Sequence, residues 1–166
     1  SFFYIPLNSY LFLASLAEYL AFYHRAASRV AIEQAAEKAG LSAWIATLPA
    51  GLDTPIGEGS RGVSGGQAQR IALARAFLDS SRRILLFDEP TAHSDIETEA
   101  ELKTTILPVL DDHLVFFATH QLHWINQMDY VLVMDHGQIV EQGTPAELAA
   151  HDGAYVRLRD EMVGAI

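Results

Sequence analysis

The stretch from Gly62 to Glu89 constrains the fold of this chain more than any other part of the sequence. It begins with a glycine-rich turn that opens a helical pattern, and it ends with the apolar run Ile84 to Phe87 followed by two carboxylates. Backbone N–H groups at such a turn and helix start form an anion site that suits phosphate. Carboxylates at a strand end can hold Mg²⁺ and leave a base for an attacking water. Together the two features predict nucleoside triphosphate chemistry.

Several short motifs resemble those of the ATP-binding cassette (ABC) ATPases. The glycine turn is similar to the signature loop of that family, and the strand from Ile84 to Glu89 is similar to its Walker B strand. The segment Ala92 to Asp95 resembles the D-loop, Thr119-His120 resembles the switch histidine, and Asp135 to Thr144 resembles the segment that follows. The resemblance runs from about Phe2 to the chain end. It implies an α/β fold, namely a partial P-loop NTPase domain of the ABC type with a mostly parallel sheet, flanking helices and a small helical subdomain.

This resemblance implies a role for each motif residue. Asp88 would bind Mg²⁺, Glu89 would act as the general base on the attacking water, and His120 would contact the γ-phosphate. The signature loop and the D-loop would contact ATP and the seam of a domain dimer, through Val63, Ser64, Gly65, Gly66, Gln67, Ser94 and Asp95. The expected cofactors are ATP and Mg²⁺. The expected partner is a second ABC nucleotide-binding domain, in a homodimer or a heterodimer.

We expect three segments along the chain. Residues 1–9 hold a strand and a remnant of the Q-loop, residues 10–80 form the helical subdomain with the signature loop, and residues 81–166 form the C-terminal part of the ATPase core. The chain begins at Ser1 inside an expected strand, and we therefore interpret it as part of a longer domain.

Local patterns predict the elements within these segments. Ser28 is suited to cap a helix over Arg29 to Lys38, Ser42 to cap the next helix, and Ser64 to cap the helix after the glycine turn. Apolar residues recur at helical spacing in that last helix, so we expect one of its faces to pack against the core. The remaining expected elements are a short helix over Leu16 to Tyr23, buried strands at Ile84 to Phe87 and Leu114 to Ala118, a hairpin over Tyr130 to Glu141, a capping box at Thr144 to Glu147, and a C-terminal helix from about Tyr155.

Composition and charge exclude several other functions. The chain of 166 residues carries a net charge of −10 without a basic stripe, so broad electrostatic binding of nucleic acid is disfavoured. It contains no cysteine, which excludes disulfides and thiolate metal sites. The apolar stretch from Phe2 to Phe22 contains proline, asparagine and glutamate, so a buried strand and a short helix are favoured over a membrane span. His120 and His123 have the spacing of a metal pair, but no third ligand is nearby, so zinc is disfavoured.

The sequence departs from the family pattern in three places. Leu7 stands where the Q-loop glutamine is expected, and leucine can neither donate nor accept a hydrogen bond. Ser94 stands where the D-loop usually has leucine. The phosphate-binding P-loop is absent, and neither lysine of the chain, Lys38 or Lys103, follows such a loop. We therefore expect the isolated chain to bind ATP weakly or not at all and to show no measurable hydrolysis.

The function implied by the resemblance is that of an exporter-type ABC transporter, in which ATP hydrolysis at a domain dimer drives export across a membrane. The segment around Glu58 would touch the transmembrane domains, although a plain solvated loop glutamate remains an alternative. The implied location is the cytoplasmic face of the inner (plasma) membrane. Residues 66–70, residues 119–122 and the tail look similar to thiol exporters that support cytochrome bd assembly, while lipid and multidrug exporters remain open. The alternative function is a catalytically degenerate ABC domain that acts as a regulatory or dimerisation partner.

Overall fold

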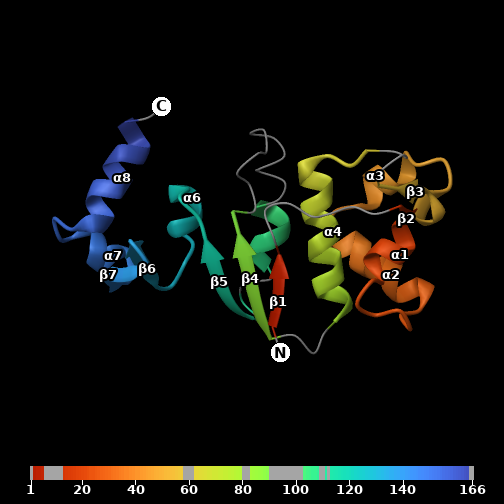
Figure 1. Cartoon of the computed structure of the whole chain (residues 1–166), viewed down its shortest axis with the longest axis horizontal. Coiled ribbons are helices and arrows are strands. Elements are labelled where there is room, and N and C mark those ends of the chain that lie inside the picture. The colour runs from red at the N-terminus through yellow and green to blue at the C-terminus, as the bar shows by residue number, and fades with distance from the viewer. Residues whose placement is uncertain are drawn as a thin grey trace. The chain divides into compact units, whose positions relative to one another are not determined.

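The computed structural model describes residues 2–5, 13–57, 62–79, 83–89, 103–108, 111 and 113–164. The chain forms two compact units, Ser1–Ala118 and Thr119–Ile166, whose elements are labelled in Figure 1. The expected residues Leu7, Glu58, Ser94 and Asp95 lie outside the described residues. Their proposed roles therefore remain predictions.

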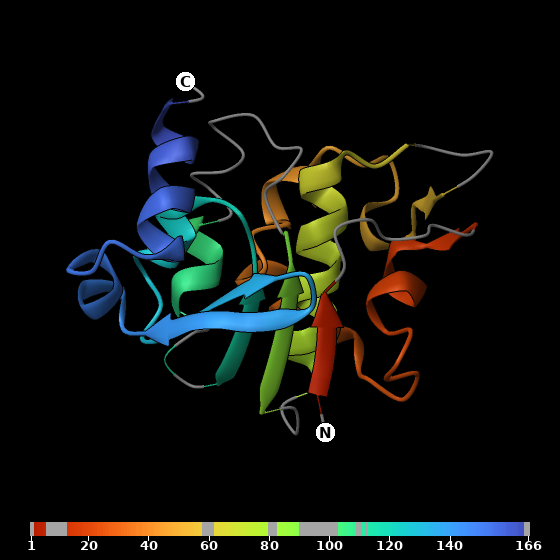
Figure 2. The same ribbon diagram turned by 60° about the vertical axis from the view of Figure 1, so that its left-hand side comes forward.

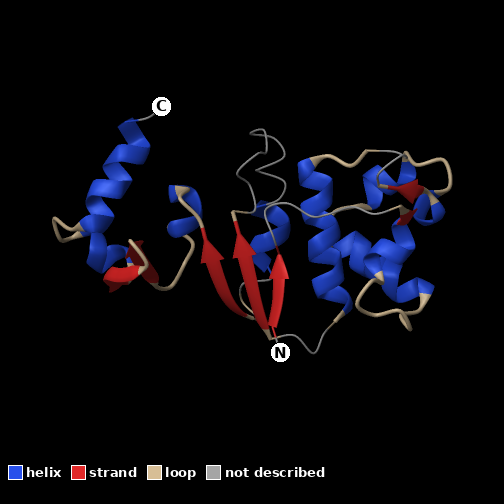
Figure 3. Cartoon of the chain, viewed as in Figure 1, coloured by secondary structure: helices blue, strands red, loops and turns tan. Residues whose placement is uncertain are grey.

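The first unit contains a three-stranded parallel sheet in the order β1-β4-β5, which Figure 3 shows as three arrows running the same way. The strands are β1 (Phe2–Ile5), β4 (Ile84–Asp88) and β5 (Leu114–Ala118). The central strand β4 buries Leu85 and Phe87 almost completely. The Phe87 ring stacks on Phe117 of β5, with 5.2 Å between the ring centroids. The parallel sheet implied by the motifs is therefore confirmed.

The burial expected for β5 was wrong. Its side chains alternate between exposed and half-buried, and Leu114 and Phe116 are 58% and 51% exposed. In the described residues β5 is an edge strand that pairs only with β4, and the alternation shows that the face carrying Leu114 and Phe116 is the more exposed one. An apolar run by itself does not distinguish a strand that is buried on both faces from one that is buried on one face.

The rest of the first unit is mostly helical, and α1 and α2 pack against α4, the long helix that follows the glycine turn (Figure 1). The Ser64-capped helix is α4, and its side chains Ile71, Leu73 and Ala74 are buried. On the expected inward face, Phe77 and Leu78 are only half-buried. The elements of this region are β2 (Ala14–Ser15), α1 (Leu16–Leu20), α2 (Arg29–Lys38), α3 (Ser42–Ala46), the 3₁₀ helix η1 (Gly51–Asp53), β3 (Pro55–Ile56), α4 (Gly65–Leu78) and a helical segment at residues 103–108.

The bounds of α2 match the prediction, and Ser28 accepts a hydrogen bond from the Ala31 N–H as its cap. The helix ends at Lys38, and Gly40, which follows the C-cap residue Ala39, has a φ of 71° in the left-handed region. The Leu41 N–H then bonds back to the Ala36 carbonyl, which is the pattern of a Schellman motif. This motif and the burial of its side chain hold Leu41 close to α2. Leu41 is the N-cap residue of α3, so the expected cap at Ser42 was wrong.

A half-buried cation joins α4 to α1. The Arg75 Nε donates a 2.7 Å hydrogen bond to the Tyr19 carbonyl, and the guanidinium lies 5.2 Å from the Tyr19 ring centroid and 5.6 Å from that of Phe22. Burial lowers the pKa of Arg75 from its usual value, but the guanidinium remains charged because its usual pKa is so high. The contact fixes the C-terminal half of α4 against α1.

The second unit is a hairpin with flanking helices, and its two antiparallel strands are the blue arrows of Figure 2. His136 and Gly137 at the hairpin tip both have positive φ, which matches the turn type favoured in two-residue hairpins. Val133, Leu148 and Tyr155 form its buried core. The elements of this unit are α6 (Leu122–Ile125), β6 (Val131–Asp135), β7 (Gln138–Gly143), α7 (Pro145–Ala149) and α8 (Ala154–Gly164).

Candidate functional site

The glycine turn before α4 is built on a capping box. The Ser64 hydroxyl accepts a 3.2 Å hydrogen bond from the Gln67 N–H, and the Gln67 side chain accepts a 2.9 Å hydrogen bond from the Ser64 N–H. This arrangement satisfies two backbone donors and confirms the expected cap. The N–H groups of Gly65 and Gly66 have no acceptor within the helix, because they belong to its first turn.

The turn lies at the surface rather than inside the fold. Gly62, Ser64 and Gly65 are exposed, Val63 is half-buried, and Gly66 is buried. A Cβ atom added at Gly65 would meet nothing within 4 Å, so the surrounding chain does not require a glycine there. The turn therefore presents the positive end of a 14-residue helix to open space.

The acidic end of β4 has an unusual backbone. Asp88 is the last residue of the strand, and Glu89 follows with a φ of 45°. A positive φ is uncommon in residues other than glycine, and such conformations concentrate at functional sites. The Glu89 N–H still donates a 2.9 Å hydrogen bond to the Ala118 carbonyl of β5. Strand β4 thus ends at Asp88 while Glu89 is still bonded to β5, and both acidic residues are half-buried at the strand end.

Tyr4 is a contact of this site that sequence reasoning missed. Its hydroxyl donates a 2.7 Å hydrogen bond to Asp88 Oδ2 from the neighbouring strand β1. This hydrogen bond raises the pKa of Tyr4 above its usual value. The contact depends on the register of β1 against β4, and the only sequence signal is a tyrosine near the end of an apolar strand.

The expected histidine follows the neighbouring strand. Ala118 pairs with Asp88 in the β4–β5 register, and His120 comes two residues later in the chain. His120 is exposed, and the Thr119 hydroxyl beside it accepts a 3.0 Å hydrogen bond from the Gln121 N–H. His120 belongs to the second compact unit and the carboxylates to the first. A site shared by His120, Asp88 and Glu89 therefore remains a prediction.

The donor set at the end of β4 fits Mg²⁺ held together with phosphate. Two carboxylates at a strand end supply hard oxygen ligands, and Mg²⁺ in nucleotide sites usually takes one or two protein carboxylates, substrate phosphates and waters. Among the residues that the structure describes, no cluster of three or more His, Cys, Asp or Glu side chains could hold a metal ion.

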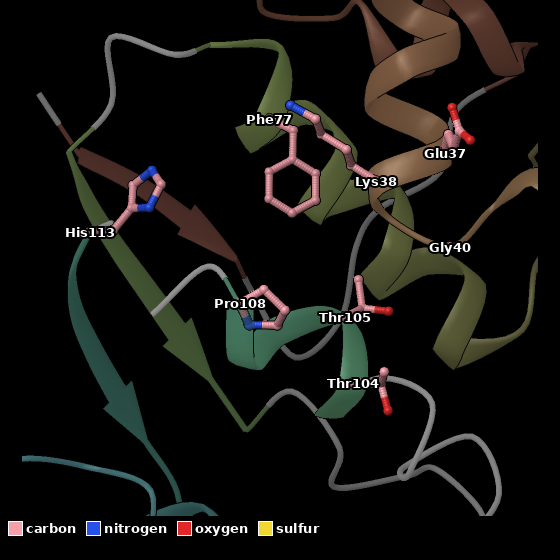
Figure 4. Close-up of a pocket in the computed structure, with 8 residues that line it drawn as sticks. All are labelled: Glu37, Lys38, Gly40, Phe77, Thr104, Thr105, Pro108 and His113. Carbon is pink, nitrogen blue, oxygen red and sulfur yellow. The ribbon is translucent and has the colours of Figure 1, made fainter. Parts of the chain in front are cut away.

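A cavity of about 440 Å³ lies in the first unit (Figure 4). None of the predicted site residues lines it, so we assign no function to it. Its lining residues are Glu37, Lys38, Gly40, Phe77, Thr104, Thr105, Pro108 and His113. Within the described part of the chain, no helix has the length and apolar character needed to cross a bilayer.

Comparisons with known proteins agree with the motifs. The family model described as "ABC transporter" matches residues 9–92. The glutathione/L-cysteine transport system ATP-binding/permease protein CydC of Bacillus subtilis strain 168 is 51% identical over 161 residues, which is 97% of this chain and 28% of that protein. The ATP-dependent lipid A-core flippase of Aliivibrio fischeri is 41% identical over 91% of this chain and 26% of the flippase.

A solved structure shows the same fold. The structure of a bacterial Atm1-family ABC exporter with ATP bound matches with a TM-score of 0.86 and 34% identity, over 97% of this chain and 28% of that chain. The present chain thus spans about a quarter of the length of the relatives it matches. The sequence motifs, the parallel sheet and these matches agree, and the chain belongs to the ABC transporter family.

Proposed function

We propose that this chain forms the C-terminal part of a nucleotide-binding domain that powers an exporter of the ABC type. The observation that carries the proposal is the combination of an exposed, capped glycine turn at the start of α4 with two carboxylates at the end of β4. Either feature alone occurs in many folds. Their presence in one chain, in the order of the ABC motifs, supports ATP chemistry.

The glycine turn would bind a phosphate group of ATP that is held by a second nucleotide-binding domain. The N–H groups of Gly65 and Gly66, together with the helix dipole, favour negative charge in front of the turn. The open space at Gly65 supports this role, because the absence of a side chain there lets a ligand approach the backbone. Ser64 and Gln67 would hold the turn in shape through their capping box. ATP bound by the partner domain would thus complete the site.

The end of β4 would supply the groups for hydrolysis. Asp88 would hold Mg²⁺, which neutralises the charge that develops on the phosphates. Glu89 would accept a proton from the attacking water, and its backbone has the left-handed conformation that is uncommon outside functional sites. His120 would orient the transferred phosphoryl group by a hydrogen bond.

The proposed substrate class is a low-molecular-mass thiol. The support is the 51% identity to a protein named for glutathione and L-cysteine transport, compared with 41% to a lipid A-core flippase. We further propose that the segment around Glu58 contacts the transmembrane part of the exporter, which places this chain at the cytoplasmic face of the membrane.

The second candidate is a degenerate domain that binds a partner without hydrolysing ATP. Leu7 favours it, because leucine at the Q-loop position cannot coordinate the metal or the water. The glutamate that follows Asp88 favours the catalytic reading.

The two candidates differ in the effect of a Glu89→Gln substitution in the full-length protein. If the chain is catalytic, Glu89→Gln removes the base and lowers ATP turnover by about 10²-fold or more, while ATP binding is retained. Glu161→Gln, at an exposed position of α8, is the matched control and should leave turnover unchanged. Equal turnover in wild type and Glu89→Gln would contradict the catalytic assignment.

A further inference from the structure

Tyr4 and Asp88 form a cross-strand contact at the edge where the metal is proposed to bind. Tyr4 pairs with Leu86 in the parallel register, and Asp88 lies two residues further along β4, so both side chains project from the same face of the sheet. The Tyr4 hydroxyl lies 2.7 Å from Asp88 Oδ2. The Tyr4 side chain is half exposed, at 50%, so packing alone does not explain a tyrosine at this position.

We propose that Tyr4 is a positioning residue that orients the Asp88 carboxylate for metal binding. This inference rests on the proposed function. A carboxylate turns easily about its last side-chain bond, and a hydrogen bond to one oxygen restricts that motion. With Oδ2 held by the tyrosine, Oδ1 remains for the cation. The donor is a neutral phenol, which holds the carboxylate without placing a positive charge beside the metal.

Hydrogen-bond partners of metal ligands have a measurable effect on affinity. Loss of such a partner usually lowers metal affinity or activity by about 10–100-fold. A Tyr4→Phe substitution removes only the hydroxyl and retains the ring, so the strand pairing should persist. Tyr23→Phe is the matched control, because Tyr23 is also exposed in the first unit and its ring contacts Phe3 and Phe22 rather than Asp88.

The test measures metal binding directly in the full-length protein. Mn²⁺ is titrated in the presence of a non-hydrolysable ATP analogue and followed by electron paramagnetic resonance. We expect Tyr4→Phe to raise the Mn²⁺ dissociation constant about 10-fold, with Tyr23→Phe unchanged. In ATPase assays the Mg²⁺ concentration for half-maximal rate should rise in parallel, with the rate at saturating Mg²⁺ close to that of wild type.

A second variant shows whether Tyr4 acts through Asp88. In an Asp88→Asn background, Tyr4→Phe should weaken Mn²⁺ binding no further, because the two residues form one unit. Unchanged or tighter Mn²⁺ binding by Tyr4→Phe would overturn the inference and leave the proposed function standing. If the wild-type protein binds no Mn²⁺ with nucleotide, the proposed function itself fails and the inference fails with it.

Discussion

Substitutions at Ser64 separate the structural role of the glycine turn from its proposed role in phosphate binding. Ser64 caps α4 and is exposed at the proposed phosphate site. Alanine removes the cap, asparagine retains it, and aspartate retains it while adding a negative charge. The three variants therefore change the stability of α4 and the charge at position 64 independently of each other.

The expected sizes follow from the hydrogen bonds of the cap. Ser64→Ala removes the acceptor of the 3.2 Å hydrogen bond from Gln67 N–H, at a cost of about 1 kcal/mol. The stability of α4 in Ser64→Asn and Ser64→Asp should be close to that of wild type, and the aspartate variant is stabilised by up to about 1 kcal/mol through its interaction with the helix dipole. At the phosphate, the same aspartate adds a repulsion of about 4 kcal/mol for two unit charges about 4 Å apart near a protein surface.

Amide hydrogen exchange of α4 and ATP turnover are measured on the same full-length variants. A cost of 1 kcal/mol corresponds to about fivefold faster exchange in α4 for Ser64→Ala. Ser64→Asp should retain wild-type exchange and lose turnover. Thr144→Ala is the matched control, because Thr144 and Glu147 form the same kind of capping box on α7 of the second unit, with hydrogen bonds of 3.2 Å and 2.9 Å. That control should speed exchange in α7 and leave turnover unchanged.

Two results would refute this reasoning. Wild-type turnover in Ser64→Asp would show that no phosphate approaches the turn. Unchanged exchange of α4 in Ser64→Ala would show that the capping box does not stabilise the helix.

Further predictions concern stability. Leu85→Ala, at the centre of the sheet, should lower the free energy of unfolding by about 2–5 kcal/mol and lower the thermal midpoint. Leu114→Ala on β5 should lower both much less, because the Leu114 side chain is 58% exposed. Equal shifts of the thermal midpoint in the two variants would contradict the burial pattern. Hydrogen bonds from the Thr144 backbone N–H and hydroxyl lower the pKa of Glu147 in the folded state. The ionised side chain therefore stabilises the fold in full at pH values above the pKa of the unfolded state. This contribution is lost as the pH falls through the lower pKa of the folded state. Unfolding of wild type between about pH 6 and pH 3 should therefore depend more on pH than unfolding of Glu147→Gln, and identical profiles would exclude this contribution.

Features that depend on a few neighbouring residues were predictable from the sequence. The start of α2, the cap at Ser64 and the capping box at Thr144 all follow from side chains that bond to backbone three residues away. The Asp88–Glu89 strand end was also predictable, because an apolar run followed by acidic residues is a local pattern.

Features that depend on tertiary arrangement were not predictable. The exposure of β5 side chains depends on what packs on each face of the sheet, and the start of α3 depends on how α2 ends. The Tyr4–Asp88 hydrogen bond joins residues 84 positions apart, and it requires the register of β1 against β4. No local pattern in the sequence encodes that register.

The backbone conformation of Glu89 sets the stability of the fold against the proposed catalytic role of this residue. A side chain at a φ of 45° crowds the following carbonyl, at a cost of about 1–2 kcal/mol that glycine avoids. A glycine at this position would therefore relax the chain and delete the acid in the same step. Stability alone would therefore favour glycine at this position, and the proposed catalytic role of the Glu89 carboxylate would account for a glutamate there.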